Sequence, residues 1–174
     1  MYSNKVLDSK VLTTPLGSMI AIASNKKLWA LQFVDQGSLE QELQLLAKQL
    51  QATITAHKNA IIDLIEAELQ QYFMGSRKEF TVPIKIQGSL FQKLVWNELQ
   101  TIPFAATRSY SEVASAIGKP GSHRAVGRAN GANRFVIIIP CHRVIYLDST
   151  VGGYNGGIAR KQWLLHHEKQ IMNT

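Results

Sequence analysis

The spacing of apolar residues changes along the chain, and this change constrains the fold more than any other feature. Over the first 35 residues, apolar side chains occur in three short runs, KVLDSKVLTT, MIAIAS and LWALQFV, separated by turn signals at residues 15–18 and 25–27. From Ser38 onward, leucines recur at helical spacing between residues 39 and 50. The order predicts an antiparallel meander followed by a helix.

A second helix is predicted over residues 60–74, with Gly75 as its stop. The next segment, RKEFTVPIKIQGS, contains Pro83 and Gly88 and loses helical periodicity, which is typical of a linker. A chain of 174 residues is long enough for two compact halves. We therefore predict an N-terminal α/β domain over residues 1–83 and a second domain over residues 84–174.

The second half is predicted to be mainly helical and to contain a helix-turn-helix. After a helix from Ser89 through Leu99, the residues Ser109 to Glu112 fit a capping box that opens a short helix. Gly118 and the following Lys-Pro-Gly make a tight turn, and Ser122 is predicted to cap the helix HRAVGRAN. The fold class is thus α/β (α+β), with a small antiparallel sheet plus helices before a mainly α-helical domain.

The positive charge of the chain belongs to its second half. Residues 1–87 hold nine Lys and Arg against eight Asp and Glu, whereas residues 88–174 hold ten against four. Charge alone leaves open a solvated basic face or a surface for a polyanion such as nucleic acid. In the second helix of the helix-turn-helix, Arg124 and Arg128 share a face and their neighbours are small, which favours sequence-tolerant contact with a backbone or a minor groove.

The stretch FVIIIPCHRVI, residues 135–145, contains the only cysteine of the chain. Its β-branched run predicts a buried strand that Pro140 ends immediately before Cys141. A lone cysteine is most often a small buried hydrophobe, but His142 and Arg143 supply donors and positive charge that favour a thiolate. One cysteine excludes an internal disulfide, and no histidine has metal-ligand spacing to it.

The sequence contains few features that indicate where the protein is located or whether it binds a nucleotide. The apolar runs are too short to span a bilayer, and the first ten residues lack a continuous apolar core, so we expect a cytoplasmic protein without a secretory signal, nucleoid-associated if prokaryotic. The stretch VGGYNGG at 151–157 lacks the Lys-Ser/Thr of a phosphate-binding loop, which leaves two interpretations: a flexible loop, or a loop whose backbone forms the wall of a pocket.

Five segments together resemble a known family: RSYSEVASAIG, HRAVGRANGAN, IPCHRVI, GGYNGG and RKQWLLHHE, in this order over residues 89–169. They are similar to the O6-alkylguanine-DNA alkyltransferase family, the methylated-DNA–protein-cysteine methyltransferases. The resemblance implies DNA repair by direct, irreversible, single-turnover transfer of the alkyl group from O6-alkylguanine, and from O4-alkylthymine, to a cysteine. It also implies double-stranded DNA as partner, bound through the minor groove with the alkylated base flipped out.

The resemblance assigns catalytic roles to four residues. Cys141 is the alkyl acceptor, and His142 is its base, acting through a water molecule. Glu168 orients the imidazole, and Tyr110 donates a hydrogen bond to the departing base.

The resemblance further places Arg124 in the duplex where the flipped nucleotide had been, and Asn133 as a brace for the active-site turn. The residues expected to bind DNA are Ser122, His123, Arg124, Ala125 and Arg128, and those expected around the base are Asn133, Val144, Gly152, Tyr154 and Asn155. Asn155 departs from the serine of some relatives. Neither a metal nor a cofactor is expected, and the protein is expected to act as a monomer.

Two other classes remain open on the sequence. A cysteine hydrolase also uses a thiol and a histidine, and it would turn over an ester or amide repeatedly. A helix-turn-helix regulator needs no thiol and would bind one undamaged sequence selectively. A binder of alkylated bases that does not repair them is disfavoured, because it should lack the cysteine.

Overall fold

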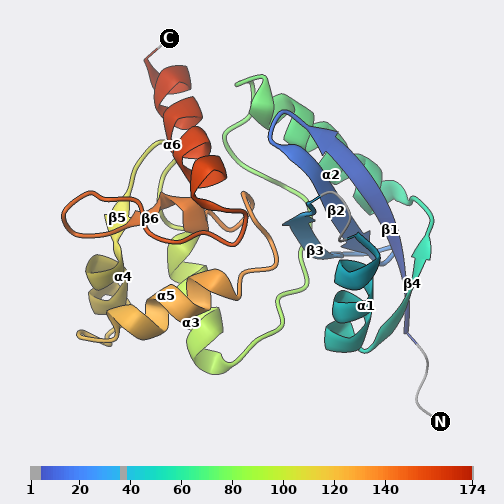
Figure 1. Cartoon of the computed structure of the whole chain (residues 1–174), viewed down its shortest axis with the longest axis horizontal. Helices are drawn as coiled ribbons and strands as arrows, with labels where there is room; N and C mark the ends of the chain where they lie inside the picture. The colour runs from blue at the N-terminus through green and yellow to red at the C-terminus, as the bar shows by residue number, and fades with distance from the viewer. Residues whose placement is uncertain (1–4, 36–38, 174) are drawn as a thin grey trace. The chain divides into compact units, whose positions relative to one another are not determined.

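The computed structural model describes residues 5–35 and 39–173 (Figure 1). The expected absence of a secretory signal rests on the first ten residues, and residues 1–4 lie outside the described ranges. Ser38, where the spacing of apolar residues was predicted to become helical, also lies outside them. The chain divides into two compact units, Met1–Lys85 and Ile86–Thr174. None of the helices in the described ranges combines the length and the apolarity needed to cross a membrane.

The first unit is built on one sheet of four strands in the order β3-β2-β1-β4. The antiparallel pairs β1–β2 and β2–β3 confirm the predicted meander. The sheet is nevertheless mixed, because β4 pairs in parallel with β1 and had no counterpart in the prediction. The strands are β1 (Lys5–Thr14), β2 (Gly17–Ala23), β3 (Leu28–Phe33) and β4 (Ala52–Ala56).

Two helices of the first unit pack against the sheet. Helix α1 (Leu39–Leu50) buries Leu46 and Leu50 against Ile20 and Ile22 of β2. Helix α2 (Ala60–Phe73) begins at Asn59, whose side chain accepts from two backbone N–H groups, and contacts β1 and β2. Both helices confirm the predicted periodicity, because their leucine and isoleucine stripes are the surfaces that they bury.

The end of the first unit is fixed by backbone hydrogen bonds to the edge of β3. Leu28 N donates to Pro83 O at 2.8 Å, and Lys85 N donates to Leu28 O at 2.7 Å. These bonds hold residues 83–85 beside β3. The compact unit therefore extends through Lys85, two residues past the predicted boundary.

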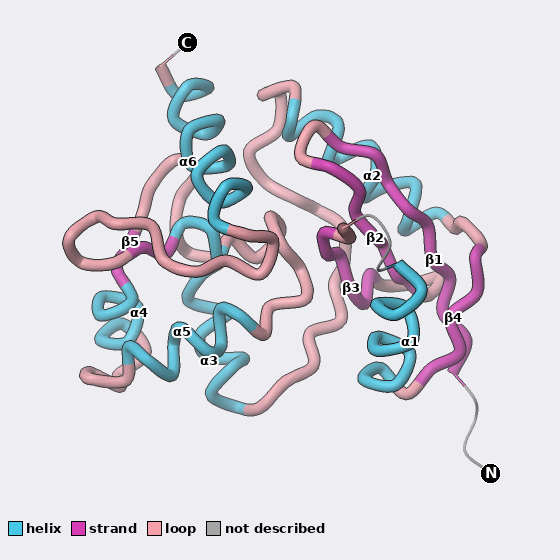
Figure 2. The backbone as a smooth tube through the Cα atoms, in the orientation of Figure 1, coloured by secondary structure: helices cyan, strands magenta, loops and turns pink. Residues whose placement is uncertain are grey.

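The second unit is mainly helical, as predicted, with helices α3, α4 and α5 in mutual contact (Figure 2). Trp96 of α3 donates from Nε1 to Ala129 O at 2.9 Å, which fixes α3 against α5. The elements are α3 (Leu90–Leu99), β5 (Arg108–Ser109), α4 (Tyr110–Ala116), α5 (His123–Gly131), the short 3₁₀ helix η1 (Cys141–Arg143), β6 (Val144–Ile145) and α6 (Ile158–Met172).

The helix-turn-helix is formed by α4 and α5. The predicted capping box is present, because Ser109 Oγ accepts from Glu112 N at 3.1 Å and the Glu112 carboxylate accepts from Ser109 N at 2.6 Å. Ser122 is the N-cap residue of α5, as predicted, but its side chain makes no capping hydrogen bond. Its hydroxyl donates instead to Lys119 O, in the turn, at 2.6 Å.

The predicted strand at residues 135–139 is also wrong. These residues are largely buried, yet residues 136–138 form a turn, and Ile137 has a positive φ of 74°. The Asn133 side chain imposes this shape, since its oxygen accepts from Phe135 N at 2.8 Å and its nitrogen donates to Ile139 O at 2.9 Å. Tertiary packing and one buried amide therefore override the β propensity of the run.

Candidate active site

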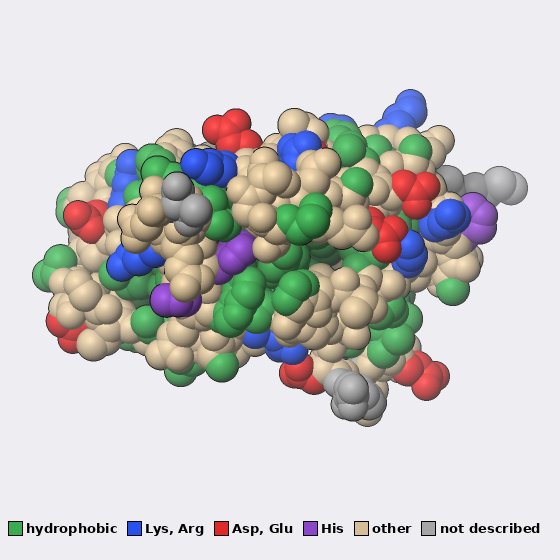
Figure 3. Space-filling model, turned by 90° about the horizontal axis from the view of Figure 1, so that it is seen from above, with side chains coloured by type: hydrophobic (Ala, Val, Ile, Leu, Met, Phe, Trp, Pro, Cys, Tyr) green, Lys and Arg blue, Asp and Glu red, His purple; other side chains and the backbone are tan. Residues whose placement is uncertain are grey.

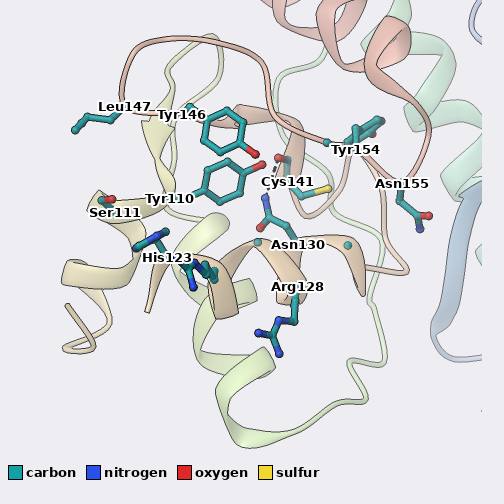
Figure 4. Close-up of a pocket in the computed structure, with 14 residues that line it drawn as sticks. Tyr110, Ser111, His123, Arg128, Asn130, Cys141, Tyr146, Leu147, Tyr154 and Asn155 are labelled. Carbon is teal, nitrogen blue, oxygen red and sulfur yellow. Dashed lines mark hydrogen bonds between the residues drawn. The ribbon is translucent and has the colours of Figure 1, made fainter. Parts of the chain in front are cut away.

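Cys141 begins the 3₁₀ helix η1 and lies at the wall of a pocket of about 630 Å³ (Figure 4). Its side chain is only 2 % exposed. Asn133, which shapes the preceding turn, also donates to Cys141 Sγ at 3.1 Å. The same amide thus holds both the backbone that leads to the thiol and the thiol itself.

Behind the thiol lies a buried group of three charged or titratable side chains. Glu168 of α6 accepts from His142 through its Oε1 atom at 2.7 Å. Arg143 donates to both oxygens of the same carboxylate, at 2.9 and 3.0 Å, and to Ile102 O at 2.7 Å. The structure therefore brings His142 and Glu168 together, as the resemblance implied.

This geometry determines which imidazole nitrogen can act as a base. Burial lowers the pKa of His142, although the hydrogen bond to Glu168 opposes that effect, so the imidazole is neutral near pH 7. Burial alone would raise the pKa of Glu168, but the bonds and charges of His142 and Arg143 hold it well below its usual range. The carboxylate accepts the proton of Nε2, and Nδ1, which has no partner among the described residues, keeps its lone pair.

The charge next to Cys141 differs from the prediction. Burial raises the pKa of the Cys141 thiol, and the contributions that lower it come from the Asn133 hydrogen bond and from Lys161. Arg143, which was predicted to favour the thiolate, is engaged by Glu168 and Ile102. Among the described residues, the cation that lowers the pKa of the thiol is Lys161 of α6.

Lys161 is fully buried and held by oxygen atoms around the pocket. Its Nζ donates to Val144 O at 2.5 Å and to Tyr110 Oη at 3.4 Å. Burial lowers the pKa of Lys161 to about 8, and the nearby Cys141 opposes this change. The ammonium charge is thus present at neutral pH and lost in mildly alkaline solution.

Tyr110 opens α4 and presents its ring to the pocket. Burial raises the pKa of its hydroxyl to about 12, so the hydroxyl is protonated at neutral pH. Because its oxygen accepts from Lys161, the O–H is available to donate to a bound molecule. Gly152 permits this placement, since a Cβ there would lie 2.6 Å from Tyr110 Oη.

The other predicted residues divide into a pocket lining and a support behind it. His123, Arg124 and Arg128 of α5 line the pocket together with Tyr154 and Asn155. In Figure 4, Tyr110 lies on one side of Cys141, and Tyr154 and Asn155 lie on the other. Asn133, Val144 and Gly152 are buried behind this lining, and Ser122 and Ala125 are not part of it.

The prediction left out several residues of the site, among them Asn130, Tyr146 and Lys161. Asn130 could have been found as a polar residue on the second helix of the helix-turn-helix. Tyr146 lies immediately after the stretch FVIIIPCHRVI, which ends at Ile145, so the motif did not include it. Its ring centroid is 5.3 Å from that of Tyr110. Lys161 lies in a helix whose face toward the pocket cannot be deduced from its sequence.

Charge on the surface is mixed rather than gathered in one block on the face shown in Figure 3, where acidic side chains lie among the basic ones. Two exposed cations, Arg124 and Arg128, line the pocket of Cys141. Within residues 5–35 and 39–173, no three His, Cys, Asp or Glu side chains come together as a metal site would require.

Two family models match the chain. The model described as "6-O-methylguanine DNA methyltransferase, DNA binding domain" matches residues 90–170, and the one described as "6-O-methylguanine DNA methyltransferase, ribonuclease-like domain" matches residues 9–86. The chain belongs to the O6-alkylguanine-DNA alkyltransferase family. The family models together span the two units seen in the fold.

Individual relatives agree with this membership. The methylated-DNA–protein-cysteine methyltransferase of Mycolicibacterium paratuberculosis is 38 % identical over 95 % of this chain and 94 % of its own. That of Mycobacterium tuberculosis is 52 % identical over 59 % of this chain and 62 % of its own. The crystal structure of Mycobacterium tuberculosis OGT in complex with DNA has a TM-score of 0.79 and 36 % identity, covering 95 % of this chain and 94 % of that one.

Proposed function

We propose that the protein repairs DNA by transferring the alkyl group of O6-alkylguanine, and of O4-alkylthymine, directly and irreversibly to Cys141. The observation that carries the proposal is the position of the only cysteine: it lines a pocket beside the helix-turn-helix, with a buried base behind it. The printed names of the relatives, which are methyltransferases that act on methylated DNA, support the same reaction.

In the proposed mechanism the neutral thiol first loses its proton. Because Nδ1 of His142 carries a lone pair and has no partner among the described residues, it accepts this proton through one water molecule. Glu168 holds the imidazole in the required tautomer and stabilises the imidazolium that forms. Lys161 stabilises the thiolate during this step.

The thiolate then attacks the alkyl carbon in line with the leaving oxygen. A bond forms between Cys141 Sγ and the carbon, the bond between that carbon and O6 breaks, and its electron pair moves into the base. The Tyr110 hydroxyl donates to the departing base and lowers the cost of its negative charge. The product thioether has no good leaving group, so each molecule reacts once.

We also propose that the second unit binds double-stranded DNA through the minor groove, with the damaged nucleotide flipped into the pocket. Helix α5 supports this proposal, because exposed Arg124 and Arg128 border the pocket while Ala125 and Gly127 are small enough for close approach. Arg124 would replace the flipped nucleotide in the stack. We propose further that the protein acts as a monomer in the cytoplasm, on the nucleoid in a prokaryote.

The test of the reaction is to follow the methyl group. The wild type and Cys141→Ala are each incubated with duplex DNA that carries radiolabelled O6-methylguanine, and label on the protein is measured. We expect label on the wild type and none on Cys141→Ala. Release of the label as a small molecule, with repeated turnover, would instead indicate a hydrolase.

The test of the binding mode is a titration of unrelated undamaged duplexes at several salt concentrations. We expect similar affinities for all sequences, because α5 presents cations and small residues rather than side chains that read bases. Affinity should fall steeply with salt. A strong preference for one undamaged sequence would support a regulator instead.

A further inference from the structure

The backbone at Ala105, in the segment between α3 and β5, has an uncommon conformation. Its φ is 63°, in the left-handed region that residues other than glycine rarely adopt. This conformation costs energy and persists only where the surrounding structure fixes it. Because such backbone strain is concentrated at functional sites, the contacts of Ala105 bear on function.

The N–H of Ala105 binds the carboxylate behind the thiol. Ala105 N donates to Glu168 Oε2 at 2.9 Å. The same segment also holds the arginine that pairs with this carboxylate, since Arg143 donates to Ile102 O at 2.7 Å and its guanidinium carbon lies 5.6 Å from the centre of the Phe104 ring. Residues 102–105 therefore bind both members of the buried ion pair.

The Ala105 N–H differs in origin from the other donors to Glu168. The carboxylate accepts from His142 Nε2 at 2.7 Å and from two nitrogens of Arg143 at 2.9 and 3.0 Å, and both of these residues belong to η1. A backbone N–H has no side-chain torsion, so it fixes the carboxylate oxygen that it binds. The other oxygen, Oε1, is thereby held toward the imidazole.

We propose that Ala105 is a positioning residue for the base: its backbone N–H holds Glu168 so that the proton of His142 stays on Nε2 and Nδ1 is left to accept the proton of Cys141. The inference rests on the proposed function, because it concerns the base of that reaction. It assigns this role to a main-chain group, in a residue whose side chain is a single methyl group.

The Ala105 N–H also limits how strongly Glu168 attracts a proton. A hydrogen bond stabilises the charged carboxylate, so its loss leaves more negative charge to stabilise a protonated His142. The other charged groups that act on His142 are Arg143 and Lys161, and the titratable group beside it is Cys141. A change confined to the Ala105 N–H alters none of these three, so His142 should become protonated at a higher pH.

The experiment removes this N–H and no side chain. Ala105 is replaced by lactic acid in the full-length chain through nonsense suppression, so that the peptide bond before it becomes an ester. Single-turnover rates of methyl transfer from duplex DNA with O6-methylguanine are measured across the acidic limb of the pH profile. We expect the midpoint of this limb to move upward by about half a pH unit to one pH unit. A structural role alone would lower the rate at every pH and leave the midpoint in place.

The matched control is the same ester at Ala106, whose N–H donates to Pro103 O at 3.1 Å in the same segment. Its midpoint should equal that of the wild type. Ala105→Gly keeps the N–H and adopts a positive φ without strain, so it should keep the wild-type midpoint and melt at an equal or higher temperature.

An unmoved midpoint in the Ala105 ester, or an equal shift in the Ala106 ester, would overturn the inference. If the Ala105 ester does not fold in a thermal melt, Ala105→Val is measured with the same two outcomes, because a branched side chain opposes the positive φ that directs the N–H. Failure of the wild type to methylate Cys141 at any pH would overturn the proposed function instead.

Discussion

Each unit of the molecule buries a glutamate that pairs with an arginine, and the two sites differ in one neighbour. Glu68 in the first unit is 1 % exposed, lies 3.2 Å from an Arg77 nitrogen and accepts from Thr81 N at 2.9 Å. Glu168 in the second unit is fully buried, pairs with Arg143 and accepts from Ala105 N at 2.9 Å. Only Glu168 also binds an imidazole, that of His142.

The two glutamates show which contacts stabilise the fold and which one serves the proposed reaction. A carboxylate that binds an arginine and a backbone N–H fixes the segments around it, and both glutamates do this. In the proposed mechanism, the added imidazole makes the second site a base for the neighbouring residue, Cys141. Burying Asn130, Asn133, His142, Lys161 and Glu168 in the second unit has a cost in desolvation that the first unit largely avoids, and the function that we propose accounts for this cost.

The largest effect on the rate of methyl transfer is expected from Glu168→Gln, and the matched variant is Glu68→Gln in the first unit. Glu168→Gln leaves the buried Arg143 without its charge partner and should lower the free energy of unfolding by about 3 kcal/mol, whereas Arg77 is 26 % exposed, so Glu68→Gln should lower it by less. Glu168→Gln should also slow methyl transfer about 100-fold, because the orientation and basicity of His142 are lost. Glu68→Gln should leave the rate within about twofold of the wild type. Chemical denaturation and single-turnover rates measure the two effects, and equal rate losses would break the comparison.

Arg124→Ala is expected to have the next largest effect, and only on duplex DNA. If Arg124 fills the space of the flipped nucleotide, its loss should slow repair of O6-methylguanine in a duplex about 30-fold, since flipping costs a few kcal/mol. Reaction with free O6-benzylguanine should change little. Arg128→Ala is the control, because it removes a cation from the same helix and should lower DNA affinity without this difference. Similar losses on both substrates would make Arg124 a structural residue.

Lys161→Met tests whether the buried cation acts on the thiol. Removing the charge should raise the pKa of Cys141 further and slow methyl transfer about tenfold at pH 7, which corresponds to one pKa unit. The pKa of Lys161 is about 8, so its charge is present below that pH and lost above it. The difference between wild type and variant should therefore shrink as pH rises through 8. A difference that stays constant up to pH 10 would show that the charge is not the cause.

The smallest effect concerns two helix caps, one in each unit. Asn59→Ala and Ser109→Ala each remove a side chain that accepts from the first turn of a helix, and each should lower the free energy of unfolding by about 1 kcal/mol. Ser109→Ala should also reduce methyl transfer about threefold, because α4 begins with Tyr110. Melting curves and transfer rates measure both. An equal effect of Asn59→Ala on the rate would show that the units are not functionally separate.

The sequence predicted those structural features that depend on residues close together in the chain. The Ser109–Glu112 capping box and the leucine stripe of α1 depend on residues three or four positions apart, and both are as expected. Cys141 and His142 were singled out by the chemistry of the stretch that contains them, whereas Glu168 was found only because the resemblance covers it. The contact between His142 and Glu168, 26 residues apart, had no signal of its own in the sequence.

What the sequence could not predict depended on contacts between distant segments. The turn at residues 136–138 replaces a strand because the Asn133 amide binds backbone on both sides of it. Lys161 acts at the site because α6 packs beside η1, which helical periodicity does not reveal. Asn130 on α5 contacts the active-site turn because its Nδ2 donates to Cys141 O. In each case the decisive partner is set by tertiary structure.

The most direct test of the central claim is the stoichiometry of the reaction. Intact protein is incubated with an excess of duplex that carries O6-methylguanine, then measured by mass spectrometry and mapped by peptide. We predict one added methyl group per chain, on Cys141, and no further repair by the modified protein. Methyl on another residue, or many repaired bases per protein molecule, would contradict the account.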